Sequence, residues 1–359
     1  GDWSSDVCSS DLELGLLGAL DDLGLRTREV AYLSSHGKLI WSEPRGMGAG
    51  YRWPQISLHR GKLQMLLFET LRSRLGADAV QCGAAVTDWS ATDSGIRIQL
   101  YDRAAGQPLG DVDGSVLIAA DGIHSAARAK LYPDEGPPAW GGTIMWRGVS
   151  RGPRFMTGRT MAMAGCKSRK FVCYPIADDG EGSYINWIAD LGFDLDHRWN
   201  REDWSRPGHL DDFLPQFSDW HFDWLDIPEV IRSAEHIYEY PMVDRDPVDR
   251  WTHGPMTLLG DAAHAMYPIG SNGASQAILD ARVLAREILV HGPTQDALLA
   301  YEAERRPATA AIVLANRGDG PDKVLDVVEE RAPSGFAHIE EVLSRTELEE
   351  VAEIGRAHV

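Results

Sequence analysis

The chain has 359 residues, of which 43% are apolar and 25% are charged, and its formal net charge is −19. This composition is typical of a globular protein with a large core, and it excludes a wholly disordered, collagen-like or disulfide-stapled chain. The longest apolar runs, 116–120 and 308–315, are far shorter than the ~20 residues that cross a membrane. Because nucleic acids and anionic membranes attract clustered Lys and Arg, the acidic charge disfavours both as partners, and we expect a small-molecule substrate.

Both ends of the chain read as foreign to the fold. Residues 1–12 have neither helical or strand periodicity nor a signal-peptide pattern, and they resemble a translated sequencing adapter, as do residues 353–359. Natural polar tails are the alternative. Since the chain starts with Gly1 and its first methionine is Met47, we expect that it is not a complete gene product.

The remaining cysteines are Cys82, Cys166 and Cys173, an odd number without CxxC spacing. Such cysteines argue against a disulfide framework or a zinc site, and they suit the reducing cytoplasm. We therefore expect a cytoplasmic protein without a bound metal.

Helices and strands alternate up to about residue 133. The leucine spacing predicts a short helix over 13–25 and a longer one that starts at Arg60 and is ended by Gly76. Strands are expected at 29–33, at 38–41 and within 80–99. The apolar run 115–120 stops at Asp121-Gly122, which is typical of a buried parallel strand that ends at a ligand crevice.

The stretch from 134 to 250 differs in texture and predicts a second, sheet-rich domain. Strands are expected at 143–150, 160–164, 170–176, 184–191 and 236–243. The tryptophans of this stretch are Trp140, Trp146, Trp187, Trp199, Trp204, Trp220 and Trp224. They could form a wall for a flat aromatic ligand, but packing against one face of a sheet is the favoured interpretation for most of them.

The last third returns to long helices. An apolar run at 255–260 ends in Gly-Asp, and after a glycine-rich loop the periodicity predicts helices over 274–290 and 296–317. Residues 322–352 predict two short acidic helices, broken at 333–335 by Pro-Ser-Gly.

The strongest chemical signal lies in residues 258–273, where a strand ends in Gly260-Asp261 and a glycine loop leads into the predicted helix. The strand delivers one carboxylate, the loop brings backbone N–H groups close to a ligand, and the helix N-terminus favours negative charge. A flavin needs this combination, because its ribityl hydroxyls require an acceptor and its pyrimidine edge requires N–H donors. For Asp261 alone, helix capping would be the simpler interpretation.

With these motifs, nearly all of residues 13–317 resemble the FAD-dependent aromatic monooxygenases of the para-hydroxybenzoate hydroxylase type. Gly260 and Asp261 match the family's second FAD-binding motif, and Asp121 and Gly122 match its Asp-Gly motif, which is implicated in contacts with FAD and the pyridine nucleotide. The further cofactor-binding residues that the resemblance implies are Arg60, Val86, Gly270, Asn272, Gly273 and Ala274. An exposed arginine and a core strand valine are the structural alternatives for the first two.

A closer likeness is to the phenazine-modifying branch of this family, the 5-methylphenazine-1-carboxylate 1-monooxygenase type. The matching segments are 41–46, 145–149, 240–247 and 267–280. The residues after Arg317 depart from this branch, so its substrate is not carried over.

The family's opening βαβ unit is absent from this sequence. That unit binds the FAD diphosphate through a Gly-x-Gly-x-x-Gly turn, and about 35–45 residues would be missing. The expected fold is therefore mixed α/β, with a Rossmann-like FAD/NAD(P)-binding domain that lacks its first βαβ unit, formed by 13–133 and 251–317. Residues 134–250 would form a mixed or antiparallel substrate-binding sheet, and residues 318–352 a C-terminal helical segment.

The resemblance implies hydroxylation of a planar aromatic or heteroaromatic substrate with O₂ and NADH or NADPH, through a flavin C4a-hydroperoxide. Pro268 would shape the wall near the reacting carbon, and Tyr240 and Arg147 are the candidates for orienting the substrate. A strand tyrosine with a satisfied hydroxyl and a surface ion-pair arginine are the structural alternatives. For His264, a capping or core role is favoured over a place near the pocket.

Two other functions remain open. One is a related flavoprotein that reduces or epoxidises an isoprenoid-like substrate, which the polar, Trp-rich middle domain disfavours. The other is an inactive fragment that does not retain FAD. The sequence is compatible with a monomer or a homodimer.

Overall fold

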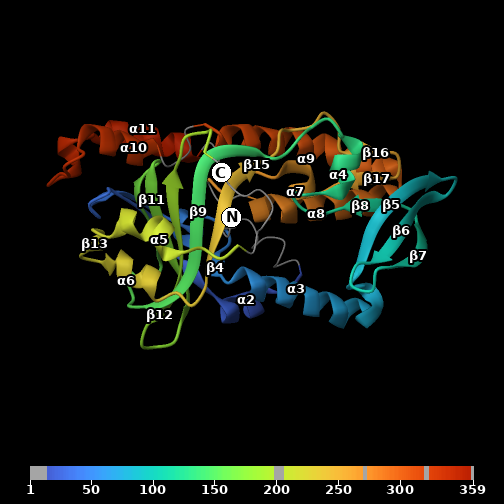
Figure 1. The fold of residues 1–359 in the computed structure, drawn as a ribbon, viewed down its shortest axis with the longest axis horizontal. Coiled ribbons are helices and arrows are strands. Elements are labelled where there is room, and N and C mark those ends of the chain that lie inside the picture. The colour runs from blue at the N-terminus through green and yellow to red at the C-terminus, as the bar shows by residue number, and fades with distance from the viewer. Residues whose placement is uncertain (1–13, 198–205, 270–272, 319–322, 357–359) are drawn as a thin grey trace.

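The structure is a computed structural model that describes residues 14–197, 206–269, 273–318 and 323–356, with side chains up to residue 350. Helices and strands are mixed along the chain, as the sequence predicts (Figure 1). One large sheet with its covering helices lies toward one end of the long axis, and long helices with two three-stranded sheets lie toward the other. None of the helices in these ranges is long and apolar enough to cross a bilayer.

The largest sheet has seven strands in the order β15-β9-β12-β11-β10-β2-β3. Their bounds are β2 Glu29–Leu33, β3 Leu39–Pro44, β9 Ala139–Gly152, β10 Thr160–Cys166, β11 Arg169–Asp178, β12 Ser183–Gly192 and β15 Ile237–Asp244. Neighbouring strands are antiparallel, except that β10 and β2 are parallel. The five strands predicted after residue 134 are all present. Because β2 and β3 join them, the edge of the sheet does not coincide with the domain boundary expected at residue 134.

One face of this sheet packs against short helices and a hairpin. These elements are α5 Leu210–Phe213, η3 Leu214–Phe217, β13 His221–Phe222, β14 Leu225–Asp226 and α6 Ile227–Arg232. Trp146, Trp187 and Trp220 are at most 2% exposed within this cluster, and Trp146 stacks on a phenylalanine of α5 at 4.9 Å. These three tryptophans therefore pack the sheet, whereas Trp199 and Trp204 lie outside the described residues.

The opposite face is covered in two ways. Over β11, β10, β2 and β3 it packs against the C-terminal elements, which are α10 Lys323–Arg331, η4 Ile339–Glu341 and α11 Arg345–Arg356. These correspond to the two short helices predicted for 322–352. Over β12, β9 and β15 the same face borders a cavity, so this half of the sheet is where side chains can meet a ligand.

The other half of the molecule is built on a small, partly parallel sheet. β17 Met256–Leu258 pairs antiparallel with β16 Thr252–His253 and parallel with β8 Leu117–Ala119. The surrounding helices are α4 Ala126–Leu131, α7 Asp261–His264, α8 Gly273–His291 and α9 Gln295–Asn316. The parallel pairing agrees with the sequence prediction, although β8 is shorter than the run 115–120 and only its last residue is buried.

The elements near the N-terminus differ most from the prediction. They are α2 Leu17–Leu23, β1 Gly24–Thr27, η1 Gly46–Ala49, β4 Gln55–Leu58, α3 Arg60–Leu75, η2 Ala77–Ala79, β5 Ala84–Thr92, β6 Gly95–Asp102 and β7 Gln107–Gly114. The predicted helix over 13–25 ends early, because residues 24–27 pair with β4. The strand β7 was not predicted, because all of its residues are exposed and its sequence shows no alternation of apolar and polar residues. In α3, Leu63 packs against α2, but Leu75 is 70% exposed because α2 covers only the first turns.

Candidate functional site

Two carboxylates follow the carboxyl ends of neighbouring parallel strands. The parallel pairing of β17 with β8 ends with Leu258 opposite Ala119. Asp261 follows the end of β17, and Asp121 follows the end of β8. Asp121 accepts a hydrogen bond from the backbone N–H of Ala127 at 3.2 Å, at the start of α4. Asp261 is the exposed first residue of α7. Both aspartates therefore lie at the sheet edge where parallel α/β sheets bind ligands.

The turns that carry these aspartates require glycine. Gly260 has φ +62° and Gly122 has φ +80°, in the left-handed region that side chains other than glycine rarely adopt. A Cβ at Gly260 would also lie 3.3 Å from the Cβ of Ala277 on α8. Gly260 is the N-cap residue of α7, so the helix-capping interpretation of Asp261 is wrong and its exposed carboxylate is accessible to a ligand.

A buried ion-pair network holds this turn from the side of α8. The carboxylate of Asp280 is fully buried and accepts hydrogen bonds from Gly260 N at 3.1 Å, His264 Nε2 at 2.5 Å and Arg305 Nε at 2.8 Å. Burial alone would raise the pKa of Asp280, but the bond from His264 and the guanidinium of Arg305 outweigh it and lower the pKa. His264 is therefore a core residue, in agreement with the favoured interpretation.

A second buried charge holds the other end of α7. Arg128, 1% exposed, donates to Ala263 O at 2.8 Å and Ala262 O at 3.2 Å, and it pairs with Glu135. A cation at these carbonyls and an anion at the N–H of Gly260 both complement the dipole of the short helix. Asp261 is thus presented on a turn that is fixed at both ends.

Sequence reasoning missed the residues that fix this turn. Asp280 carries a detectable signal in the sequence, because it is a charged residue at helical spacing from the apolar residues Ala277 and Leu284 of α8. Arg128 and Arg305 carry no such signal, since the α7 carbonyls that Arg128 binds and the Asp280 carboxylate that Arg305 binds lie far along the chain from them.

Three of the predicted site residues line one cavity of about 590 Å³. Arg60 comes from the start of α3, Arg147 from β9 and Tyr240 from β15. Arg147 Cζ lies 5.9 Å from the centroid of the Tyr240 ring. Burial raises the pKa of Tyr240, and the nearby guanidinium groups of Arg147 and Arg60 partly offset that rise. Arg60 is exposed, as the alternative interpretation expected, yet it contributes to this cavity.

The cavity favours anions. Its lining residues with a full formal charge are Arg60, Arg147, Arg151 and Glu235. Arg151 is engaged by Asp179 at 2.7 Å, and three guanidinium groups against one carboxylate give the lining a positive formal charge. Cations paired with an aromatic side chain suit a flat, negatively charged ligand.

An apolar cluster adjoins the Tyr240 end of the cavity. Tyr240 packs with Met145 of the sheet and with Tyr267 and Ile269 of the loop between α7 and α8. Pro268 is half-buried between the last two. The predicted wall residue therefore belongs to the loop that meets the substrate face of the sheet.

The remaining predicted residues are less informative. Gly273 and Ala274 form the first turn of α8, while Gly270 and Asn272 lie outside the described residues. Val86 lies on β5, is 39% exposed, and is not among the residues that line the cavity.

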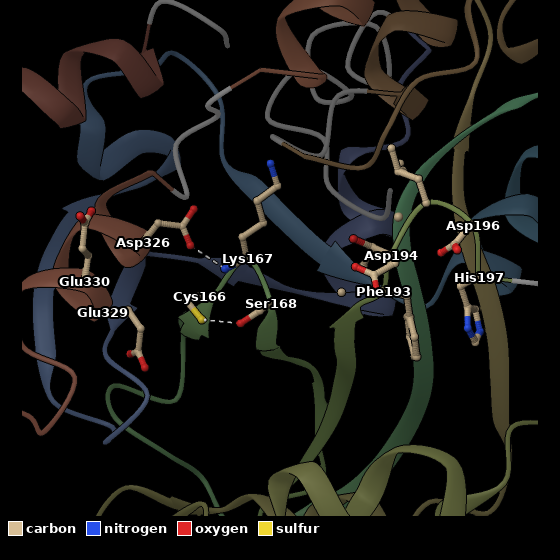
Figure 2. A pocket seen from close by; sticks show the side chains of 15 residues that line it. Cys166, Lys167, Ser168, Phe193, Asp194, Asp196, His197, Asp326, Glu329 and Glu330 are labelled. Atoms are coloured by element: carbon tan, nitrogen blue, oxygen red, sulfur yellow. Dashed lines mark hydrogen bonds between the residues drawn. The ribbon is translucent and has the colours of Figure 1, made fainter.

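A larger cavity of about 900 Å³ lies beyond the end of the same sheet (Figure 2). Figure 2 shows Asp326 on one side of it and Asp194, Asp196 and His197 on the other, with Lys167 between them. The backbone N–H of Lys167 donates to Asp326 at 2.7 Å. Carboxylates dominate this lining and no predicted site residue is part of it, so we assign the site to the smaller, cationic cavity.

Known proteins resemble this chain in sequence. A family model described as an FAD binding domain matches residues 226–316. The phenazine 1,6-dicarboxylic acid hydroxylase of Lysobacter antibioticus is 46% identical over 312 residues, which cover 85% of this chain and 76% of the relative. A 3-amino-4-hydroxybenzoate 2-monooxygenase of Streptomyces platensis is 30% identical over 321 residues, with coverages of 86% and 74%.

A solved structure supports the fold class. A variant of Klebsiella pneumoniae HpxO, complexed with FAD, matches with a TM-score of 0.72 at 22% identity. The match covers 98% of this chain and 84% of that one. The mixed α/β fold expected from the sequence is thus confirmed.

Proposed function

Because this chain belongs to the FAD-dependent aromatic monooxygenases, we propose that the cavity lined by Arg60, Arg147 and Tyr240 binds a planar aromatic or heteroaromatic acid for hydroxylation. The observation that carries the proposal is the convergence of two guanidinium groups and a half-buried phenol from three separate elements on one cavity. A guanidinium binds a carboxylate in bidentate geometry, and an aromatic face packs against a flat ring.

FAD is the cofactor of this family, and the described residues fit it. A Cβ at Gly260 would crowd Ala277 at 3.3 Å, so the turn that carries Asp261 packs closely against α8, as a fixed cofactor-binding turn requires. The exposed carboxylate of Asp261 is an acceptor for ribityl hydroxyls. Asp121 and Gly122 follow the neighbouring strand, and Arg60 begins a helix of 16 residues, where both the guanidinium and the helix dipole favour phosphate.

When bound, FAD would supply the redox chemistry, which is acceptance of hydride from NAD(P)H and activation of O₂, so that one oxygen atom of O₂ enters the ring and the other leaves as water. The protein's own part is to bind, orient and shield the substrate. Arg147 neutralises the substrate carboxylate. Tyr240, whose hydroxyl is protonated at neutral pH as in any tyrosine of ordinary or raised pKa, donates a hydrogen bond that fixes the ring plane. Met145, Tyr267 and Ile269 exclude water from that end of the cavity.

The relative from Lysobacter acts, by its name, on a phenazine dicarboxylic acid. A fused heteroaromatic acid is therefore the substrate class that we propose for this chain. A neutral isoprenoid substrate fits less well, because it offers no negative charge to Arg147.

The proposal is tested by substrate binding to the FAD-saturated protein. We expect Arg147→Met to weaken binding of phenazine-1-carboxylate by about tenfold or more, since a hydrogen bond to a charged group contributes about 1.5–3 kcal/mol. Arg154→Gln is a matched control, because Arg154 pairs with Asp178 on the same sheet but outside the cavity. Equal binding by all three proteins would refute the proposed site.

A further inference from the structure

One polar side chain lies in the middle of a central strand. Asn186 is the fourth residue of β12, which pairs with β9 on one side and β11 on the other. Along β12 the odd-numbered residues Ile185 and Trp187 are buried in the aromatic core on the far face. Because side chains alternate across a strand, Asn186 is on the cavity face, where it lines the cavity together with Arg147 and Tyr240.

No side-chain hydrogen bond among the described residues accounts for an asparagine at this position. Its cross-strand neighbours are Val149 on β9 and Tyr174 on β11, and the next residue along β12 on the same face is Ile188. Asparagine is depleted in strands, where it neither packs like a β-branched residue nor finds a turn to cap. A valine would suit this part of the sheet better.

The amide also has an unused donor. Nδ2 of Asn186 is buried and has no hydrogen-bond acceptor within the described part of the chain. An unsatisfied buried donor destabilises a protein, and each such group in a native structure calls for an explanation. Because the residue as a whole is only partly buried and borders the cavity, a turn of its amide group brings this donor to a ligand there, and that ligand is the acceptor that would satisfy it.

We propose that Asn186 is a specificity-determining residue whose Nδ2 donates a hydrogen bond to an uncharged ring nitrogen of the substrate. This inference rests on the proposed function, in which Arg147 takes the carboxylate. The two residues divide the task by chemistry, because a guanidinium suits an anion whereas a neutral amide suits a neutral acceptor.

The register of the sheet supports a substrate with two separate polar groups. Arg147 is directly opposite Ile188, two residues along β12 from Asn186. Such diagonal neighbours lie about 7–8 Å apart. This separation is larger than any single hydrogen-bonding group of a ligand. The two residues would therefore contact different edges of a fused ring system. The substrate class is therefore an N-heteroaromatic carboxylate with fused rings.

Two acids of the same shape test the inference. Phenazine-1-carboxylate has ring nitrogens, and anthracene-1-carboxylate carries C–H groups in their place. Calorimetric titration of the FAD-saturated protein should give about tenfold tighter binding of the phenazine acid, because the anthracene leaves the buried donor unpaired. In Asn186→Leu this preference should fall to about one, through weaker binding of the phenazine acid alone.

A second variant guards against misfolding. Asn186→Val suits the strand by propensity, so we expect it to raise the melting temperature of the ligand-free protein while also losing the preference for ring nitrogen. An asparagine with only a structural role would show the reverse, a lower melting temperature with the preference retained. Retained preference in both variants, or equal binding of the two acids by the wild type, would overturn the inference.

Arg147→Met separates this inference from the proposed function. It should weaken binding of both acids alike and leave the preference between them unchanged. If neither acid bound more tightly than neutral phenazine, the proposed function itself would fail. If both acids bound equally tightly, with Arg147→Met weakening both, only the role of Asn186 would fail.

Discussion

The Asp280 network makes a quantitative prediction for the turn that carries Asp261. In Asp280→Asn the shape of the side chain stays, but the charge that pairs with Arg305 is lost. Arg305 is only 8% exposed, so its guanidinium becomes a buried charge without a counterion. Breaking a buried pair in this way costs about 3–5 kcal/mol, which lowers the melting temperature by roughly 10 °C.

The same network predicts how stability depends on pH. The folded-state pKa of Asp280 is lowered from 3.8. Its ionised form therefore stabilises the fold above about pH 4, and this contribution is lost as the pH falls through the lowered pKa. The difference in melting temperature between the wild type and Asp280→Asn should be wide at pH 7 and narrow as the pH falls below 4, as measured by circular dichroism.

Two controls make this prediction specific. The double variant with Arg305→Met removes both charges and should recover much of the lost stability. Asp113→Asn on β7 breaks an exposed pair with Arg97 of β6 and should leave the melting temperature unchanged. If Asp280→Asn were no less stable than Asp113→Asn, the network would not hold the turn as we describe.

Three further predictions concern the cradle, the cavity and the core. Gly260→Ala should weaken FAD binding, measured by flavin fluorescence, because φ +62° and the 3.3 Å approach to Ala277 both resist a Cβ; unchanged affinity would contradict the cradle. Arg147→Met should raise KM for aromatic acids more than it lowers kcat, and a pure kcat effect would argue against substrate binding there. Trp187→Phe loses the 2.9 Å hydrogen bond to Ser150 Oγ and part of a fully buried side-chain volume. We expect the free energy of unfolding, measured in urea, to fall by about 2–3 kcal/mol. A change within about 0.5 kcal/mol would show that this core is loosely packed.

Local patterns predicted most of the strands and long helices. Alternation located the five strands of the middle segment, and the apolar runs that end in Asp121-Gly122 and Gly260-Asp261 proved to be neighbouring parallel strands. These features depend on residues near in sequence. The pairing of residues 24–27 with β4 was missed, because nothing local distinguishes them from the end of a leucine-rich helix.

The chemical partners of the site could not be derived in the same way. The resemblance suggested Arg147 and Tyr240, and the structure brings them to one cavity with Arg60. The pairing of Asp280 with Arg305 depends on how α8 and α9 dock, and periodicity within either helix does not determine that. Asn186 could have been noticed from the alternation in the first half of β12, where it lies between Tyr184 and Ile188 on its own face.

Oxygen incorporation tests the central claim most directly. The FAD-saturated protein is supplied with NAD(P)H, phenazine-1-carboxylate and oxygen-18-labelled O₂, and the products are analysed by mass spectrometry. We expect a hydroxylated phenazine that carries one oxygen-18 atom. Arg147→Met should form much less of this product, and Arg154→Gln should form as much as the wild type. A protein that holds FAD and oxidises NAD(P)H but incorporates no label into any aromatic acid would contradict the assignment of this cavity as a hydroxylation site.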